Sequence, residues 1–184
     1  KDTARVLGRM YDGIEYRGFH QLVVEDIARY SHVPVWNGLT DEAHPTQVLA
    51  DLLTMQEFGE RPLHEMSVCY LGDARFNMAC SLLVGGTQMG MDVRICAPLA
   101  LQPPAELVAR MRELARSTGA HLSLEADPKL AVAGADFLYT DVWVSMGEPD
   151  EVLRQRIDQF LPYQVYAALM LATGKASTRL RHCL

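Results

Sequence analysis

Hydrophobic and polar residues alternate along this chain with two different periods. Apolar positions three and four residues apart predict helices, whereas short uninterrupted apolar runs predict buried strands. The helical spacing covers residues 1–11, about 19–30, 45–58, about 77–89, 105–117, a short segment near 129–133 and two later helices. The apolar runs cover residues 13–17, 33–36, 67–71, 92–97, 121–124 and 137–140. Helices and strands are therefore expected to alternate through the whole chain.

This alternation predicts an α/β fold. Continuous apolar strands separated by helices are typical of parallel sheets that are covered by helices on both faces. A turn with glycine and proline at residues 59–62 marks a boundary. We therefore expect two Rossmann-like lobes, a partial first lobe with a connecting helix over 1–60 and a second lobe over 61–184. Ligands of such sheets bind at the carboxyl ends of the strands. The polar pairs at predicted strand ends are Gly72-Asp73, Thr140-Asp141 and His182-Cys183.

Charge and cysteine content limit the class of protein. A net charge of −6 without a run of basic residues argues against a nucleic-acid partner. No apolar stretch reaches the roughly 18 residues that a membrane span needs, so no membrane partner is expected. The four cysteines, at positions 69, 80, 96 and 183, lack the paired spacing of metal ligands. We expect buried free thiols, no metal and a cytoplasmic location.

The segment 36–47, WNGLTDEAHPTQ, carries the strongest chemical signal in the first lobe. A turn-rich loop delivers His44, and Pro45 follows at the first helical position, where a missing N–H costs nothing. The N–H groups of a first helical turn favour an anion or a polarised carbonyl oxygen. The neutral imidazole of His44 and the carboxamide of Gln47 would add directional hydrogen bonds to a small, oxygen-rich ligand. Taken alone, the segment is also compatible with a connector helix beside an incidental histidine.

Further segments place polar groups at strand ends in the second lobe. The predicted strand 137–140 leads into DVWVSMGE at 141–148, and HCL stands at 182–184. Together with HPTQ at 44–47, these segments resemble the ornithine carbamoyltransferases in identity and in order. YLGDARFNM at 70–78 resembles that family's loop after the first strand of its amino-acid-binding domain. Segments 1–13 and 16–18 resemble the family's mid-domain helix and the strand after it, so the likeness covers essentially the whole chain.

This resemblance implies transfer of a carbamoyl group from carbamoyl phosphate to the δ-amine of L-ornithine, giving L-citrulline and phosphate, in arginine biosynthesis or arginine catabolism. Acyl transfer needs donors aimed at the oxygen that becomes anionic and an unprotonated amine against the carbonyl carbon. Arg17, which could also be a solvated strand-edge residue, is expected to contact carbamoyl phosphate. His44 is expected to donate to the carbamoyl oxygen, and Gln47 to accept from the carbamoyl NH₂. No cofactor, metal or nucleophilic side chain is implied.

The resemblance also implies an ornithine site made by Asn77, Asp141, Ser145, Met146, Cys183 and Leu184. Asp141, otherwise a turn or capping residue, is expected to bind an ammonium group of ornithine and to orient the cysteine. Asn77 is expected at a helix start, as an N-cap and as a contact of the α-carboxylate or α-amino group. Cys183, otherwise a small buried hydrophobe, is expected beside the attacking amine. The expected catalytic residues are Arg17, His44, Asp141 and Cys183, with Arg75, Trp143 and Glu148 in supporting positions.

Some expected parts of the family pattern are missing. The family's Ser-x-Arg-Thr-Arg phosphate loop would precede Lys1, and a further arginine would follow Leu184. We therefore expect that both ends are cut from a longer protein and that residues 1–184 alone are inactive. Phe76 stands where many relatives carry a second asparagine, and residues 78–80 and 166–168 are less polar than usual.

Two other functions remain open from the sequence. The chain could be a binding or assembly module without catalysis, or a carbamoyltransferase for a related amine such as putrescine or acetylornithine. Retention of the motif residues favours catalysis, and the Asp-x-x-x-Ser-Met-Gly pattern at 141–147 points to the ornithine branch. The resemblance further implies a homotrimer or higher homo-oligomer, with active sites shared between subunits.

Overall fold

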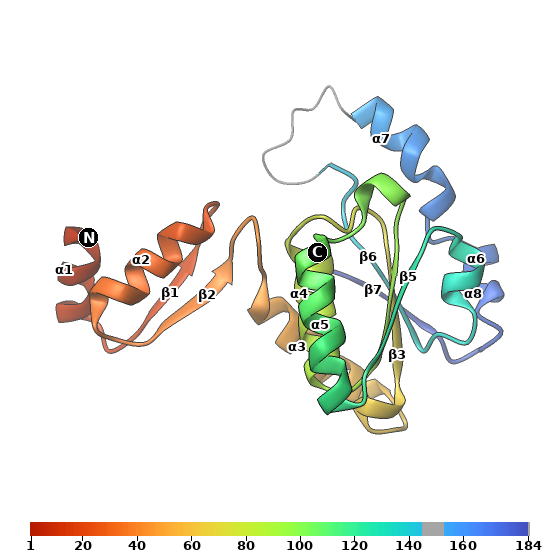
Figure 1. Ribbon diagram of the computed structural model, residues 1–184, viewed down its shortest axis with the longest axis horizontal. Helices are drawn as coiled ribbons and strands as arrows, with labels where there is room; N and C mark the ends of the chain where they lie inside the picture. Colours follow the sequence, from red (N-terminus) through yellow and green to blue (C-terminus); the bar gives the residue numbers. More distant parts are fainter. Residues whose placement is uncertain (145–152, 184) are drawn as a thin grey trace.

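The computed structural model describes residues 1–144 and 153–183 of the chain. The first lobe contains α1 (Asp2–Met10), β1 (Ile14–Arg17), α2 (Gln21–Ser31) and β2 (Val35–Leu39). Its two strands pair in parallel, from Ile14 opposite Val35 to Arg17 opposite Leu39. The long helix α3 (Pro45–Phe58) then leads from this lobe to the second, which Figure 1 shows as the larger body.

The second lobe contains five parallel strands in the order β5-β4-β3-β6-β7. These strands are β3 (Ser67–Leu71), β4 (Asp92–Cys96), β5 (His121–Glu125), β6 (Phe137–Thr140) and β7 (Arg179–His182). The helices are α4 (Asn77–Gln88), α5 (Ala105–Thr118), α6 (Pro128–Val132), α7 (Leu153–Phe160) and α8 (Ala167–Ala172). Short 3₁₀ helices occur at η1 (Leu63–Glu65), η2 (Leu99–Leu101) and η4 (Leu161–Tyr163). The predicted α/β class with parallel sheets is therefore confirmed.

Both faces of the larger sheet are covered, and β3 shows how. Its side chains alternate between the faces, as in any strand. Val68 and Tyr70 pack in one cluster with residues of α3, α4 and α5. Cys69 and Leu71 pack in a second cluster with residues of α6 and α8. Figure 1 shows these two groups of helices on opposite sides of the strands, which explains why β3 is buried at every position.

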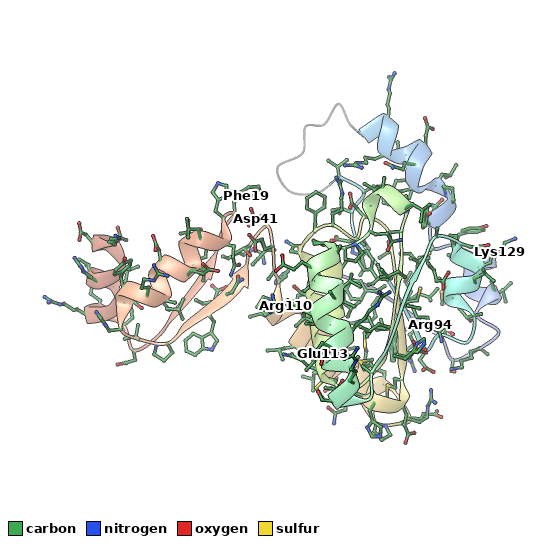
Figure 2. The ribbon with its side chains drawn as sticks, viewed as in Figure 1. Phe19, Asp41, Arg94, Arg110, Glu113 and Lys129 are labelled. Carbon is green, nitrogen blue, oxygen red and sulfur yellow. The ribbon has the colours of Figure 1, made fainter. Side chains whose placement is uncertain are left out.

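Helix α2 begins at Gln21, two residues later than the predicted 19–30. The carboxylate of Asp41 accepts a hydrogen bond from the backbone N–H of Gln21 at 3.1 Å. The backbone N–H of Asp41 in turn donates to the carbonyl of Phe19 at 2.7 Å, and Figure 2 shows these two residues together at the end of the lobe. The loop after β2 thus satisfies a free N–H of the first helical turn, and it holds Phe19 outside the helix.

Strand β2 also differs from its prediction, because it covers Val35–Leu39 and not 33–36. The carbonyl of Pro34 accepts from the N–H of Ile14 at 2.9 Å, and pairing with β1 then continues through Asn37. Proline has no N–H for the ladder, so the strand begins after it. Gly38 leaves room within the strand for the carboxylate of Glu15, which a side chain at position 38 would displace.

Helix α3 has the predicted bounds and is held tightly against α4. A Cβ atom added to Gly85 of α4 would lie 2.4 Å from Cγ1 of Val48, so this close approach requires glycine. All four cysteines are free, three of them buried and Cys183 half-buried, as expected. No helix among the described residues is long and apolar enough to cross a lipid bilayer.

Candidate functional site

Several of the residues singled out from the sequence come together where α3 meets the carboxyl ends of β6 and β7. Tyr139 of β6 and Arg181 of β7 both donate hydrogen bonds to Asp51 of α3. His44 begins the same helix, and Asp141 and Cys183 directly follow the two strands. We call the group His44, Gln47, Asp51, Asp141 and Cys183 the strand-end site.

His44 is the N-cap residue of α3, and only 8% of its surface is exposed. Its backbone N–H donates to Oγ of Ser81 in α4 at 2.8 Å, which fixes the helix start to the second lobe. Its Nδ1 lies 3.4 Å from Oγ1 of Thr46. Burial, and then the positive charge of Arg17, lower the pKa of His44 below its usual 6.5. The imidazole is therefore neutral at pH 7, with one ring nitrogen carrying a proton.

Arg17 ends β1 and is exposed. Its charge reaches His44 strongly enough to oppose protonation of the imidazole. A guanidinium on this side of the site is suited to a phosphate or carbonyl oxygen. The first lobe thus supplies a cation to a site whose other groups lie on α3 and the second lobe.

Asp141 and Cys183 form a direct contact across two neighbouring strand ends. The thiol of Cys183 donates to Oδ1 of Asp141, with 2.8 Å between sulfur and oxygen. Burial and this carboxylate raise the pKa of Cys183 from 9.0 to about 12. The cysteine is a neutral thiol at physiological pH, because the thiolate would be poorly solvated and would face a negative charge.

This contact predicts low thiol reactivity. At pH 8 the thiolate fraction of Cys183 should be roughly 10³-fold below that of a thiol with pKa 9.0. We expect alkylation of Cys183 by iodoacetamide to be slowed accordingly, and to accelerate when Asp141→Asn removes the charge. Peptide mass spectrometry over a time course measures both rates. Alkylation at the rate of an unhindered thiol would contradict the contact.

The sequence predicted Asn77 as the N-cap of α4, but Asn77 is the first residue of the helix. The N-cap is Phe76, which makes no side-chain cap hydrogen bond. Nδ2 of Asn77 instead donates to the backbone carbonyl of Thr40 at 2.7 Å. Thr40 is fully buried, and its hydroxyl donates to Gln21 at 2.7 Å. Asn77 therefore ties the loop between the lobes to α4.

Two of the expected supporting residues have clear partners. Arg75 binds both carboxylate oxygens of the buried Asp73, at 2.9 and 2.6 Å, and lies 4.8 Å from the ring centroid of Phe76. Trp143 packs near Phe160 of α7, with 6.3 Å between ring centroids. Ser145, Met146, Glu148 and Leu184 lie outside the described residues.

Sequence analysis did not identify four residues that organise this region: Thr40, Asp51, Ser81 and Arg181. One of them had a usable signal. Asp51 stands among Val48, Leu52 and Met55, which form the buried stripe of α3. An acidic residue within an apolar stripe is rarely buried without partners, so its position alone indicated a buried hydrogen-bonding role.

A cavity of about 470 Å³ adjoins the strand-end site on the side of Asp141. Its lining includes Thr140, Asp141, Trp143 and His182. Among the described residues no cluster of three or more His, Cys, Asp or Glu side chains is placed to hold a metal ion. The strand-end site thus offers a neutral imidazole, a carboxamide, a carboxylate and a thiol, and the carboxylate of Asp141 also lines the cavity.

Known proteins match this chain along nearly its whole length. A catabolic ornithine carbamoyltransferase of Pseudomonas putida is 60% identical over 184 residues, which are 100% of this chain and 55% of that protein. An ornithine carbamoyltransferase of Cutibacterium acnes is 58% identical with the same coverage. The solved ornithine carbamoyltransferase of Pyrococcus furiosus has a TM-score of 0.93 at 40% identity, covering 100% of this chain and 57% of that one. The chain thus spans about half the length of these relatives.

Two family models divide the chain between them. The model for the carbamoyl-P binding domain of aspartate/ornithine carbamoyltransferases matches residues 1–57. The model for the Asp/Orn binding domain of the same family matches residues 64–184. The first match ends within α3, and the second begins after the turn that follows this helix. The chain belongs to the aspartate/ornithine carbamoyltransferase family.

Proposed function

We propose that the protein containing this chain transfers a carbamoyl group from carbamoyl phosphate to the δ-amine of L-ornithine. The amine nitrogen bonds to the carbonyl carbon, the bond from that carbon to the phosphate oxygen breaks, and the amine gives up a proton. Citrulline and phosphate are the products. The observation that carries the proposal is the neutral, buried His44 at the start of α3, on the same site as the Asp141–Cys183 pair.

The carbamoyl half of the reaction is assigned to Arg17, His44 and Gln47. The N–H of the neutral His44 imidazole donates to the carbamoyl oxygen as that oxygen becomes anionic. Arg17 offsets negative charge on carbamoyl phosphate, and its charge also keeps His44 neutral. Gln47 accepts from the carbamoyl NH₂ and so orients the planar group for attack.

The ornithine half is assigned to Asp141, Cys183 and Asn77, together with Ser145, Met146 and Leu184 by the family resemblance. The carboxylate of Asp141 binds an ammonium group, and it already accepts from the thiol of Cys183. Since the pKa of that thiol is raised to about 12, Cys183 acts as a neutral neighbour of the amine and not as a nucleophile. Asn77 receives the α-carboxylate or α-amino group.

The wider assignments rest on the same family relationship. The two lobes are proposed as 1–60 and 61–184, which the family matches at 1–57 and 64–184 support. Homo-oligomerisation as a trimer or larger assembly, a cytoplasmic location and a role in arginine metabolism are proposed with them. P. putida has a relative named as catabolic and Campylobacter jejuni one named as anabolic, so the proposed role covers both directions of arginine metabolism.

An acceptor assay tests the proposed function. We expect the full-length protein that contains this chain to form citrulline from carbamoyl phosphate and L-ornithine. Its kcat/KM for putrescine, N-acetylornithine and L-aspartate should be lower by about 10²-fold or more, because the site's charged groups would be left unpaired. Preference for another amine would overturn the ornithine assignment. Absence of any carbamoylated product with all four acceptors would favour a binding module.

A further inference from the structure

Asp51 is a buried charge that the proposed reaction does not use directly. It lies on the face of α3 that otherwise carries Val48, Leu52 and Met55, and its exposed fraction is 0%. A carboxylate in such surroundings is costly unless donors surround it. Packing of the helix alone therefore does not account for a carboxylate at this position.

Three donors from three elements reach the two oxygens of Asp51. The hydroxyl of Tyr139 in β6 donates to Oδ2 at 2.8 Å. A guanidinium nitrogen of Arg181 in β7 donates to Oδ1 at 2.8 Å. Nε2 of Gln47, one turn earlier on α3, donates to the same Oδ1 at 3.2 Å. Burial and the negative charge of Asp51 raise the pKa of Tyr139, so the phenol keeps the proton that it donates.

The carboxylate determines which way the amide of Gln47 points. An ionised carboxylate only accepts hydrogen bonds, so the nitrogen end of the Gln47 amide must face Asp51. The oxygen end, Oε1, then points away, and it has no hydrogen-bond partner in the part of the chain that the structure describes. The free acceptor stands in the first turn of α3, three residues after His44.

We propose that Asp51 is a positioning residue for the carbamoyl group. It fixes Gln47 with Oε1 presented to the carbamoyl NH₂, and Tyr139 and Arg181 fix the carboxylate. The same contacts hold the first turns of α3 against the two strands that lead to Asp141 and Cys183. This inference rests on the proposed function, and it adds a determinant of how the electrophile is oriented.

A double-mutant cycle in the full-length protein tests this role. Asp51→Asn removes the charge and can donate to Gln47, which frees the amide to turn over. We expect kcat/KM for carbamoyl phosphate to fall about tenfold, the effect of a misplaced hydrogen bond. In a Gln47→Ala background the same change should cost less than about twofold, because the residue that Asp51 orients is gone.

Asp136 provides a matched control at the other end of the sheet. Its part-buried carboxylate accepts from Arg61, Lys175 and Ser67 before β6 begins. We expect Asp136→Asn and Asp51→Asn both to lower the melting temperature, but Asp136→Asn should leave kcat/KM within about twofold. If Asp51→Asn does not fold, Tyr139→Phe keeps the carboxylate and removes one donor. Its smaller loss of kcat/KM should also vanish in the Gln47→Ala background.

The possible results separate the two proposals. A wild-type protein that forms no citrulline overturns the proposed function and, with it, the role of Asp51. Suppose that the wild type is active and that the fold-losses in kcat/KM from Asp51→Asn and Gln47→Ala multiply in the double variant. This result overturns only the role of Asp51. Losses that do not multiply, with an unaffected Asp136→Asn variant, support it.

Discussion

Replacing His44 with alanine is expected to lower kcat for citrulline formation by roughly 10²–10³-fold, the usual effect of removing one oxyanion donor. The side chain is almost fully buried and neutral, so it can donate to the carbamoyl oxygen without repelling Arg17. Its backbone N–H, which donates to Ser81, survives the substitution and keeps the start of α3 in place. Steady-state kinetics with both substrates varied measures the change.

Two further variants make this result specific. His44→Gln retains a side-chain donor, so it should recover part of the lost kcat. His121 is an exposed histidine at the start of β5, and it forms a hydrogen bond with Asp92 at 3.0 Å. His121→Ala should leave kcat unchanged. If His44→Ala raises only KM for carbamoyl phosphate, His44 positions the substrate without stabilising the transition state.

Replacing Asp141 with asparagine is expected to lower kcat/KM for L-ornithine by about 10²-fold, since the ammonium group loses its charged partner. The substitution preserves shape, and an amide oxygen can still accept from the thiol of Cys183. The loss is therefore attributed to charge and not to the packing of the strand end. Initial rates over a range of ornithine concentrations, at saturating carbamoyl phosphate, give the value.

Asp92→Asn is the control for this variant. Asp92 begins β4 and accepts from Arg94 at 2.7 Å and from His121 at 3.0 Å, so it is also a paired carboxylate. It lies at the amino end of its strand, where the proposed reaction has no group. A loss of ornithine kcat/KM as large in Asp92→Asn as in Asp141→Asn would show that general destabilisation, not ammonium binding, explains the effect.

Local signals predicted many of the element bounds well. The observed bounds of α3, β3 and β6 equal the predicted 45–58, 67–71 and 137–140. Pro45 marks a helix start through its own backbone chemistry, and the apolar runs of β3 and β6 reflect burial on both faces. Such signals lie within the segment that they define, so no knowledge of distant contacts is needed.

Two of the errors occurred at positions that contact residues distant in the sequence. Helix α2 starts at Gln21 because Asp41, twenty positions later, accepts from its N–H. Asn77 stands at the first position of α4, and its side chain donates to Thr40, 37 positions earlier. Both contacts depend on how the loop between the lobes folds back, which no local pattern contains.

The amino-acid sequence was enough to predict the alternation of helices and strands, the family, and the motif residues His44, Gln47, Asp141 and Cys183, because each is encoded in a short segment. The interactions between these segments became known from the folded structure. The contact between Asp51 and Arg181 joins residues 130 positions apart, and that between Cys183 and Asp141 joins residues 42 positions apart. Burial then made His44 neutral and Cys183 a thiol. Protonation and hydrogen-bond direction depend on the surroundings that folding creates, and a residue's identity alone does not specify them.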